Sequence, residues 1–178
     1  MKLRVREIAL YAMLGALMYA TKLVTDLLPN INVLGALAIA YTLVYRKKAL
    51  YPIYIFVLLT GIFAGFATWW IPYLYIWAIL WAAAMLLPRD VAAKENRLIY
   101  MVACAAFGLL FGTLYAPGQA LLFGLDFRGA IAWIIAGLPW DLVHGVSNFF
   151  MGLLIVPVAK LLQKLERSLP NASPPRNC

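Results

Sequence analysis

Residues 33–66 read VLGALAIAYTLVYRKKALYPIYIFVLLTGIFAGF, two apolar runs separated by three consecutive cations. The first run, Val33 to Tyr45, is short for a membrane crossing, and the second, Ala49 to Phe66, is of marginal length. Apolar runs bounded by charged residues are typical of membrane helices, because positive charge collects at one membrane surface. The cations Arg46 to Lys48 therefore predict a break between two membrane helices.

The same pattern continues through the rest of the chain. It has 178 residues, of which 65% are hydrophobic and only 12% charged, so it does not have the composition of a soluble globular domain. A crossing takes about 20 residues, so six crossings take about 120 and leave little for a second domain. We predict an all-α membrane protein, a six-transmembrane-helix bundle over residues 1–167 with a disordered polar tail over residues 168–178. The other four spans are Val5 to Leu28, Ile71 to Leu87, Leu98 to Phe123 and Trp140 to Leu165.

One apolar stretch is too short to be a further crossing. Phe127 to Leu138 has only about 12 residues, which suits a re-entrant or interfacial segment. Pro139 follows it, and proline is favoured in the first turn of a helix. We therefore expect Pro139 to start the last helix.

The cations are distributed unevenly between the two ends of these spans. Counted by alternate connection, 13 of the 15 Lys and Arg fall on one side and only Lys22 and Arg128 on the other. Positive charge is retained in the cytoplasm, so both termini are expected to be cytoplasmic. No basic face is interleaved with aromatic residues, which argues against a nucleic-acid partner. The 13 are Lys2, Arg4, Arg6, Arg46, Lys47, Lys48, Arg89, Lys94, Arg97, Lys160, Lys164, Arg167 and Arg176.

Three polar residues share one face of the last span. Asp141, His144 and Asn148 recur at i, i+3 and i+7, and His144 is the only histidine in the chain. Ionisable groups within a membrane span usually face the bundle interior or a wet cavity. One interpretation is the polar wall of a ligand pocket. The other is structural, with Asp141 capping the helix and His144 making an interhelical hydrogen bond.

A second polar group is expected at the same outer end. Lys22 and Asp26 are four residues apart near the end of the first span, which predicts either an ion pair at the membrane surface or one side of a polar ligand site. The residues expected to converge with them are Thr25, Asn30, Asn32, Gln119, Asp126 and Arg128.

Aromatic residues are abundant near this outer end. Tryptophan and tyrosine form belts at membrane interfaces, which is one interpretation, and lining a cavity that holds a flat, partly apolar ligand is the other. The aromatic residues are Trp69, Trp70, Tyr73, Tyr75, Trp77, Tyr115, Trp133 and Trp140.

The first span carries small residues at Ala12, Ala16 and Ala20, which permit close packing within the bundle or against a partner. Several catalytic signatures do not occur: the chain has no P-loop, no H-E-x-x-H and no G-x-S-x-G. One histidine and no outward cysteine suit a transition metal poorly, so no metal site is expected.

Three short sequence motifs resemble those of one protein family. YTLVYRKK at residues 41–48, WWIPYLY at 69–75 and PWDLVHGVSN at 139–148 resemble those of the substrate-binding S component of energy-coupling factor (ECF) vitamin transporters, in the cobalamin-type subgroup. The resemblance extends over roughly residues 5–165.

The resemblance implies a binding subunit in the prokaryotic plasma membrane. Such a subunit binds a vitamin at its outer face, around Asn30, Trp69, Gln119 and Asp141. It docks through Ala12, Ala16 and Ala20 onto a membrane coupling subunit (the T component). Two ABC ATPases on that partner use ATP and Mg, so the chain itself is expected to be no enzyme and to carry no cofactor.

The ligand has two candidates. The aromatic residues and the few outward cations favour a large, weakly charged ligand. The resemblance to the cobalamin-type subgroup implies cobalamin, bound without a thiol because Cys104 is expected in the inner half of its helix. Pantothenate is the alternative, with Arg128 or Lys22 as the partner of its carboxylate. Met1-Lys2 lacks the Met-His metal site of cobalt and nickel members. Two hypotheses from other classes are a small intramembrane enzyme with Asp141 and His144 as acid and base, and an assembly protein without a ligand.

Overall fold

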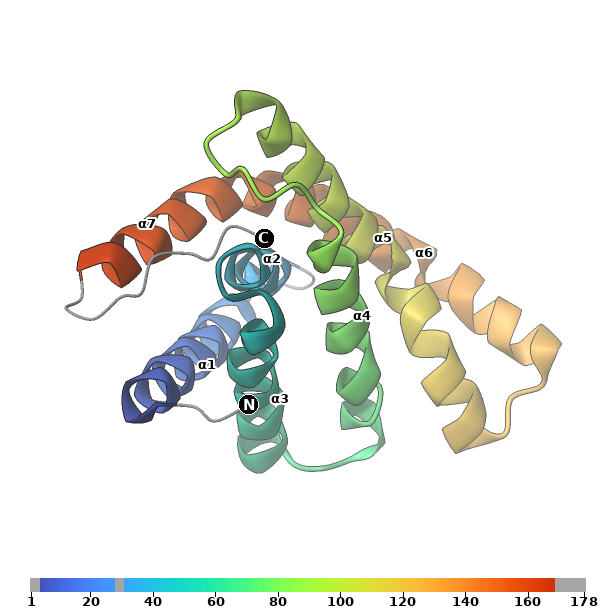
Figure 1. Ribbon diagram of the computed structural model, residues 1–178. Helices are drawn as coiled ribbons and strands as arrows, with labels where there is room; N and C mark the ends of the chain where they lie inside the picture. The colour runs from blue at the N-terminus through green and yellow to red at the C-terminus, as the bar shows by residue number, and fades with distance from the viewer. Residues whose placement is uncertain (1–3, 28–30, 169–178) are drawn as a thin grey trace.

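The computed structural model describes residues 4–27 and 31–168, and all regular structure in these two ranges is helical (Figure 1). The predicted all-α class is therefore confirmed. Asn30 and the predicted tail beyond Ser168 lie outside the described residues. The elements are α1 (Val5–Thr25), α2 (Leu34–Tyr45), η1 (Arg46–Ala49), α3 (Leu50–Ala64), η2 (Thr68–Trp70), α4 (Tyr73–Met85), α5 (Lys94–Phe123), α6 (Phe127–Met151), η3 (Gly152–Leu154) and α7 (Ile155–Ser168).

Five helical stretches are long and apolar enough to cross a membrane, which indicates a membrane-embedded protein. The second of them contains both α2 and α3, and the last contains α6, η3 and α7. The five are Val5–Thr25, Leu34–Ala64, Thr68–Met85, Lys94–Phe123 and Phe127–Ser168.

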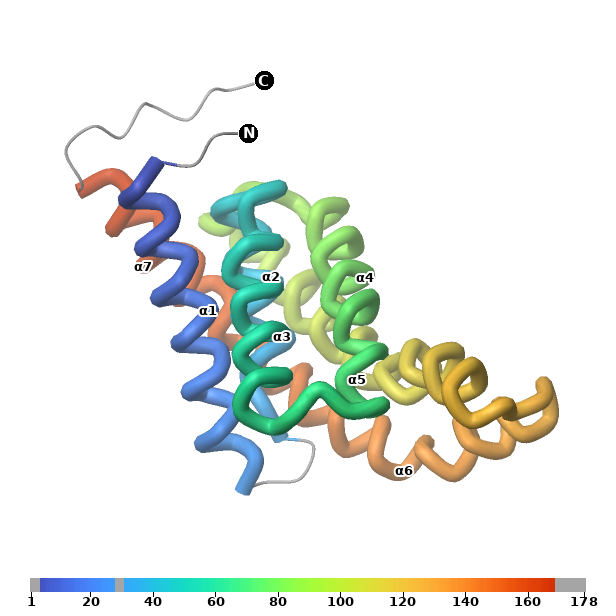
Figure 2. The backbone as a smooth tube through the Cα atoms, turned by 90° about the horizontal axis from the view of Figure 1, so that it is seen from below, coloured from blue at the N-terminus to red at the C-terminus, as the bar shows by residue number. Residues whose placement is uncertain are grey.

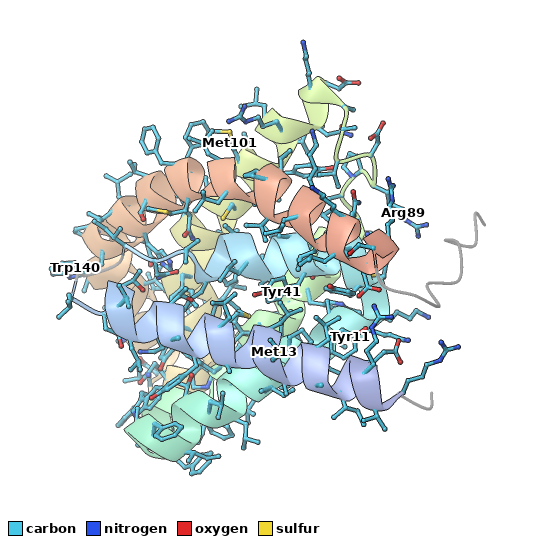
Figure 3. All side chains as sticks on the ribbon, turned by 90° about the vertical axis from the view of Figure 1, so that its left-hand side faces the viewer. Tyr11, Met13, Tyr41, Arg89, Met101 and Trp140 are labelled. Atoms are coloured by element: carbon cyan, nitrogen blue, oxygen red, sulfur yellow. The ribbon has the colours of Figure 1, made fainter. Side chains whose placement is uncertain are left out.

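The chain doubles back between α2 and α3, as Figures 1 to 3 all show. The turn is made at Arg46, which has a positive φ of 52° that L-residues rarely adopt. Two hydrogen bonds to α4 hold it: Trp81 donates its indole N–H to the carbonyl of Arg46 (3.1 Å), and the guanidinium of Arg46 donates to the carbonyl of Met85 (2.5 Å). The break expected at Arg46 to Lys48 is thus present, and α4 fixes its geometry.

Helix α2 lies at the centre of the bundle and is seen end-on in Figure 1. Ten of its 12 residues are buried, on every side of the helix. It packs against α4 and α7 most extensively and also touches α1, α5 and α6. A helix that is apolar all round has no face for solvent, so the other helices must surround it.

The start of α1 and the end of α7 lie together at one end of the bundle (Figure 2). Arg6 of α1 forms an ion pair with Glu166 of α7 (3.5 Å), and Lys48 of η1 forms one with Glu7. Figure 3 shows Arg89 toward the same end and Trp140 at the opposite end. The start of α1 and the end of α7 therefore lie at the same end of the bundle.

The expectation for residues 127–139 is wrong. Phe127 to Leu138 is not a separate segment, and Pro139 does not start a helix, because α6 runs without interruption from Phe127 to Met151. The helix starts where Asp126 accepts a hydrogen bond from the N–H of Gly129 (2.7 Å). Pro139 is tolerated inside it, as prolines often are in membrane helices. The C-terminal half of α5 and the N-terminal half of α6 extend together away from the other helices (Figures 1 and 2).

Glycines allow α5 and α6 to pack closely. A Cβ atom on Gly108 would lie 2.7 Å from the carbonyl oxygen of His144, and one on Gly112 would lie 2.4 Å from a carboxylate oxygen of Asp141. A Cβ on Gly145 would lie 2.4 Å from Leu109. Small residues at such contacts are the usual means by which membrane helices approach each other.

We expect Gly108→Ala to destabilise the bundle by about 1 to 3 kcal/mol, because the new methyl group overlaps a backbone carbonyl that cannot rotate away. Thermal unfolding of the detergent-purified protein measures the effect. Gly137→Ala is the matched control, since no heavy atom lies within 4 Å of its Cβ position on α6. Equal stability of the two variants would show that α5 and α6 do not depend on this contact.

Candidate ligand-binding site

A cavity of about 200 Å³ lies at the start of α2. It is enclosed by the last turns of α1, the residues before α2, the first turns of α4, the middle of α5 and the second half of α6. Because α2 begins only at Leu34, it does not fill the space on the N-terminal side of that residue. Side chains of the neighbouring helices line this space. The lining residues are Lys22, Thr25, Asp26, Ile31, Asn32, Leu34, Tyr73, Trp77, Phe107, Phe111 and His144.

A pair of polar side chains forms one corner of the cavity. The Oδ1 atom of Asn32 accepts a hydrogen bond from the N–H of Leu34 (3.3 Å), and this contact fixes which way its amide points. Its Nδ2 atom lies 3.3 Å from Nε2 of His144 and therefore donates to it. Nε2 must then be unprotonated, so His144 is neutral with its proton on Nδ1. Asn32 thus satisfies the first N–H of α2 and sets the tautomer of His144.

The opposite corner carries charge. Lys22 and Asp26 form an ion pair (2.5 Å) along the last turn of α1. The side chain of Lys22 is 18% exposed and that of Asp26 is 52% exposed, so the ammonium lies deeper and the carboxylate faces outward. The start of α2 adds partial positive charge, about half an elementary charge for a helix N-terminus. The electric field in the cavity favours an anionic group near Lys22.

Aromatic rings form the rest of the wall. Tyr73, Trp77, Phe107 and Phe111 follow one another with centroid distances of 6.0, 5.8 and 5.8 Å. The ring of Phe111 also meets His144 edge-on at 5.1 Å. Such a wall offers flat apolar surface to a ligand, and Trp77 adds a buried indole N–H that has no partner among the described residues.

The cavity brings together only part of the predicted site. Asn32, Tyr73 and His144 line it, and so do Lys22, Thr25, Asp26 and Trp77 from the two predicted clusters. The residues expected in the site that do not line it are Trp69, Trp70, Tyr115, Gln119, Arg128, Trp140, Asp141 and Asn148.

Three of these aromatic residues support the wall from behind. Tyr115 donates its hydroxyl hydrogen to the carbonyl of Trp69, which ties α5 to η2. Trp69 packs edge-on against Tyr73 at 5.7 Å. Trp70 donates its indole N–H to the carbonyl of Val57 on α3 (2.8 Å). These residues position the segment that precedes Tyr73.

The remaining candidates lie on α5 and α6, away from the cavity. Gln119 is half-buried near the C-terminal end of α5. Arg128 is exposed in the first turn of α6. Trp140 is 60% exposed and lies at one edge of the molecule in Figure 3. None of the three is near enough to the cavity to line it.

Asp141, His144 and Asn148 do share a buried face of α6, as predicted, but the face meets α5. Asp141 accepts a hydrogen bond from the N–H of Gly112 (3.0 Å), so it joins two helices rather than capping one. Asn148 is fully buried, and neither amide atom has a hydrogen-bond partner among the described residues. Of the three, only His144 lines the cavity, and it contacts Asn32, which lies before the start of α2, so this is not a hydrogen bond between two helices.

Phe107 and Phe111 are lining residues that sequence reasoning missed. A signal was present: they are four residues apart on α5, each immediately before a glycine, Gly108 and Gly112. The glycines pack against α6, so the phenylalanine beside each one points toward α4 and the cavity.

A metal centre finds no support in the residues from 4 to 27 and 31 to 168, where no three His, Cys, Asp or Glu side chains cluster. Cys104 is fully buried in the core, so its thiol does not face the cavity. The cavity is suited to hold an organic molecule by an ion pair, hydrogen bonds and ring contacts.

Comparison with known protein families, with curated proteins and with solved structures finds no match to this chain. The geometry of the cavity and the sequence are therefore the observations that bear on function.

Asn148→Leu should stabilise the protein by about 1 kcal/mol, because it removes a buried amide without partners and keeps its approximate shape. Asn96→Leu is the control: Asn96 is also buried, but its amide donates to the carbonyl of Asp90 (2.7 Å), so this change should destabilise. Chemical unfolding in detergent compares the two. A loss of stability in Asn148→Leu would mean that the amide is satisfied, by water or ligand, and would extend the site toward it.

Proposed function

We propose that this chain is the substrate-binding S component of an ECF-type vitamin transporter in a prokaryotic plasma membrane. The observation that carries the proposal is the cavity at one end of the bundle, with Lys22 and His144 at its corners and aromatic rings between them. This end is opposite the cationic one: α1 starts beside the end of α7 and reaches the cavity with its last turn. Its 21 residues span about 30 Å, the thickness of the hydrocarbon core.

Six crossings fit this proposal better than five. The stretch Leu34–Ala64 is helical throughout, but it reverses at Arg46, so α2 and α3 count as two crossings. With 12 residues, α2 covers only about 18 Å. Short helices are tolerated at membrane depth when protein surrounds them, and α2 is buried on all sides. Both termini are then cytoplasmic, and the cavity opens outward.

The size of the cavity favours the smaller of the two candidate vitamins. Drug-sized ligands occupy pockets of about 300 to 1,000 Å³, and this cavity has about 200 Å³. Cobalamin is much larger than such ligands and would need the surrounding helices to separate. Pantothenate requires only a modest opening. Its carboxylate would meet Lys22 rather than Arg128, since Arg128 does not line the cavity.

The exposed face of α1 supports a partner for transport. Ala12, Ala16 and Ala20 are exposed, whereas Leu14 and Met18 pack into the bundle. A flat strip of small residues lets another membrane helix approach closely. We assign it to the coupling subunit, whose two ABC ATPases supply energy from ATP and Mg. The chain itself then needs no catalytic residue or cofactor.

The geometry gives less support to an intramembrane enzyme. An acid and base pair must share one reacting group, but Asp141 bonds to the N–H of Gly112 and does not line the cavity. His144 reaches the cavity and bonds to Asn32. No hydrogen bond joins Asp141 to His144 within the described part of the chain.

Binding of pantothenate should weaken about tenfold or more in Asn32→Ala and His144→Ala, because each change removes a polar corner group and leaves its partner unsatisfied. Thermal shift of the detergent-purified protein, with cobalamin and other vitamins alongside, measures it: a ligand at 100 times its Kd stabilises by about 2.7 kcal/mol. Trp140→Ala, on the exposed side of α6, is the control. Unchanged affinity in both cavity variants would remove this cavity from vitamin binding.

Ala12→Trp and Ala16→Trp should abolish vitamin uptake by cells while binding to the isolated protein stays near normal, because the bulky rings keep a partner helix away. Uptake of labelled vitamin and binding to purified protein are compared. Leu110→Trp is the control, since Leu110 is also exposed on a membrane helix, α5, away from this strip. Retained uptake in both alanine variants would contradict docking through α1.

A further inference from the structure

Lys22 is the only cationic side chain among the residues that line the cavity. Its ammonium bonds to the carboxylate of Asp26 and to no other group in the described ranges. The rest of the polar lining is neutral: Thr25 donates its hydroxyl hydrogen to backbone carbonyls of its own helix, and Asn32 is paired with His144. Lys22 therefore holds the one positive charge that a ligand could reach among the described lining residues.

The two partners of this ion pair differ in their surroundings. The side chain of Asp26 is about half exposed, whereas that of Lys22 is mostly buried against the cavity. An ion pair between residues i and i+4 at a surface is weak, because water solvates the charges when they separate. Asp26 can therefore leave Lys22 and face water at little cost, while Lys22 remains beside the cavity and needs an anion.

We propose that Asp26 occupies the position of the ligand's anionic group, and that the carboxylate of a small organic acid displaces it from Lys22. The exchange replaces one carboxylate by another, so the charge balance of the cavity is kept. The apolar body of the acid lies against Tyr73, Trp77 and Phe111. A hydrogen-bond acceptor on the ligand takes the Nδ1–H of His144, which no described residue accepts.

This inference rests on the proposed function and narrows its substrate to small monocarboxylic acids with an apolar part. A neutral molecule gains no binding free energy from Lys22, because Asp26 already pairs with the ammonium group. A dianion suffers repulsion from Asp26, which stays close to the mouth of the cavity. Asp26 thus acts as an internal competitor that sets how tightly the acid is held and how readily it is released.

The test uses acids with their neutral counterparts: pantothenate and panthenol, biotin and biotinamide, nicotinate and nicotinamide. Affinities are measured on the purified full chain for wild type, Asp26→Asn and Lys22→Gln. At least one acid should bind wild type about tenfold more tightly than its neutral counterpart. Asp26→Asn should tighten binding of that acid several-fold and leave the neutral compound unchanged. Lys22→Gln should reduce binding of the acid to the level of the neutral compound.

Glu95→Gln and Lys47→Gln are matched controls, since both residues are exposed and far from the cavity in the sequence and the fold. Both should bind like wild type. Thermal unfolding without ligand checks that every variant is folded; if Lys22→Gln is not, Asp26→Asn carries the test.

Equal binding of acids and neutral compounds, or weaker acid binding in Asp26→Asn, would overturn the exchange while leaving a vitamin-binding function in place. If no compound in a full vitamin panel binds wild type, the proposed function fails and this inference fails with it.

Discussion

The packing of α2 on all sides is the constraint on which the rest of the structure depends. This helix has no polar face, so α1, α4, α5, α6 and α7 must cover it. Its far end is anchored because the carbonyl and the guanidinium of Arg46 are both held by α4. At its start, the surrounding helices extend beyond it. The cavity is the space that results, and its walls are the inner faces of helices already required to enclose α2.

The polar groups of the cavity meet two requirements at once. Asn32 satisfies the first N–H of α2 and fixes the tautomer of His144, so these buried groups are not left unpaired. The charged pair is confined to the last turn of α1, where water still reaches Asp26. Between them, the phenylalanine rings need no partners, whereas the indole N–H of Trp77 has none among the described residues. The site therefore offers hydrogen bonds, charge and apolar surface without an isolated charge buried in the membrane.

The helices could be read from the sequence because apolar runs and charged breaks fix them locally: the first span was expected at Val5 to Leu28, and α1 is Val5–Thr25. The path through residues 127–139 could not be read so directly, since Pro139 suggests a helix start and only the cap at Asp126 shows otherwise. The same holds for the site. Spacing places Asp141 and His144 on one face, but the glycines of α5 decide which of them meets a neighbouring helix and which meets the cavity.

The central position of α2 also bears on how the protein is made. Twelve residues are too few to be held stably in a bilayer alone, so under the six-crossing proposal α2 would enter the membrane paired with α3, as a hairpin closed at Arg46. One of its main covering helices, α7, leaves the ribosome after α1 to α6. Until α7 is made, the apolar helix α2 lies open on one side. The packing around α2 is thus completed only after α7 is made, and a chain cut short before α7 would leave α2 uncovered on that side.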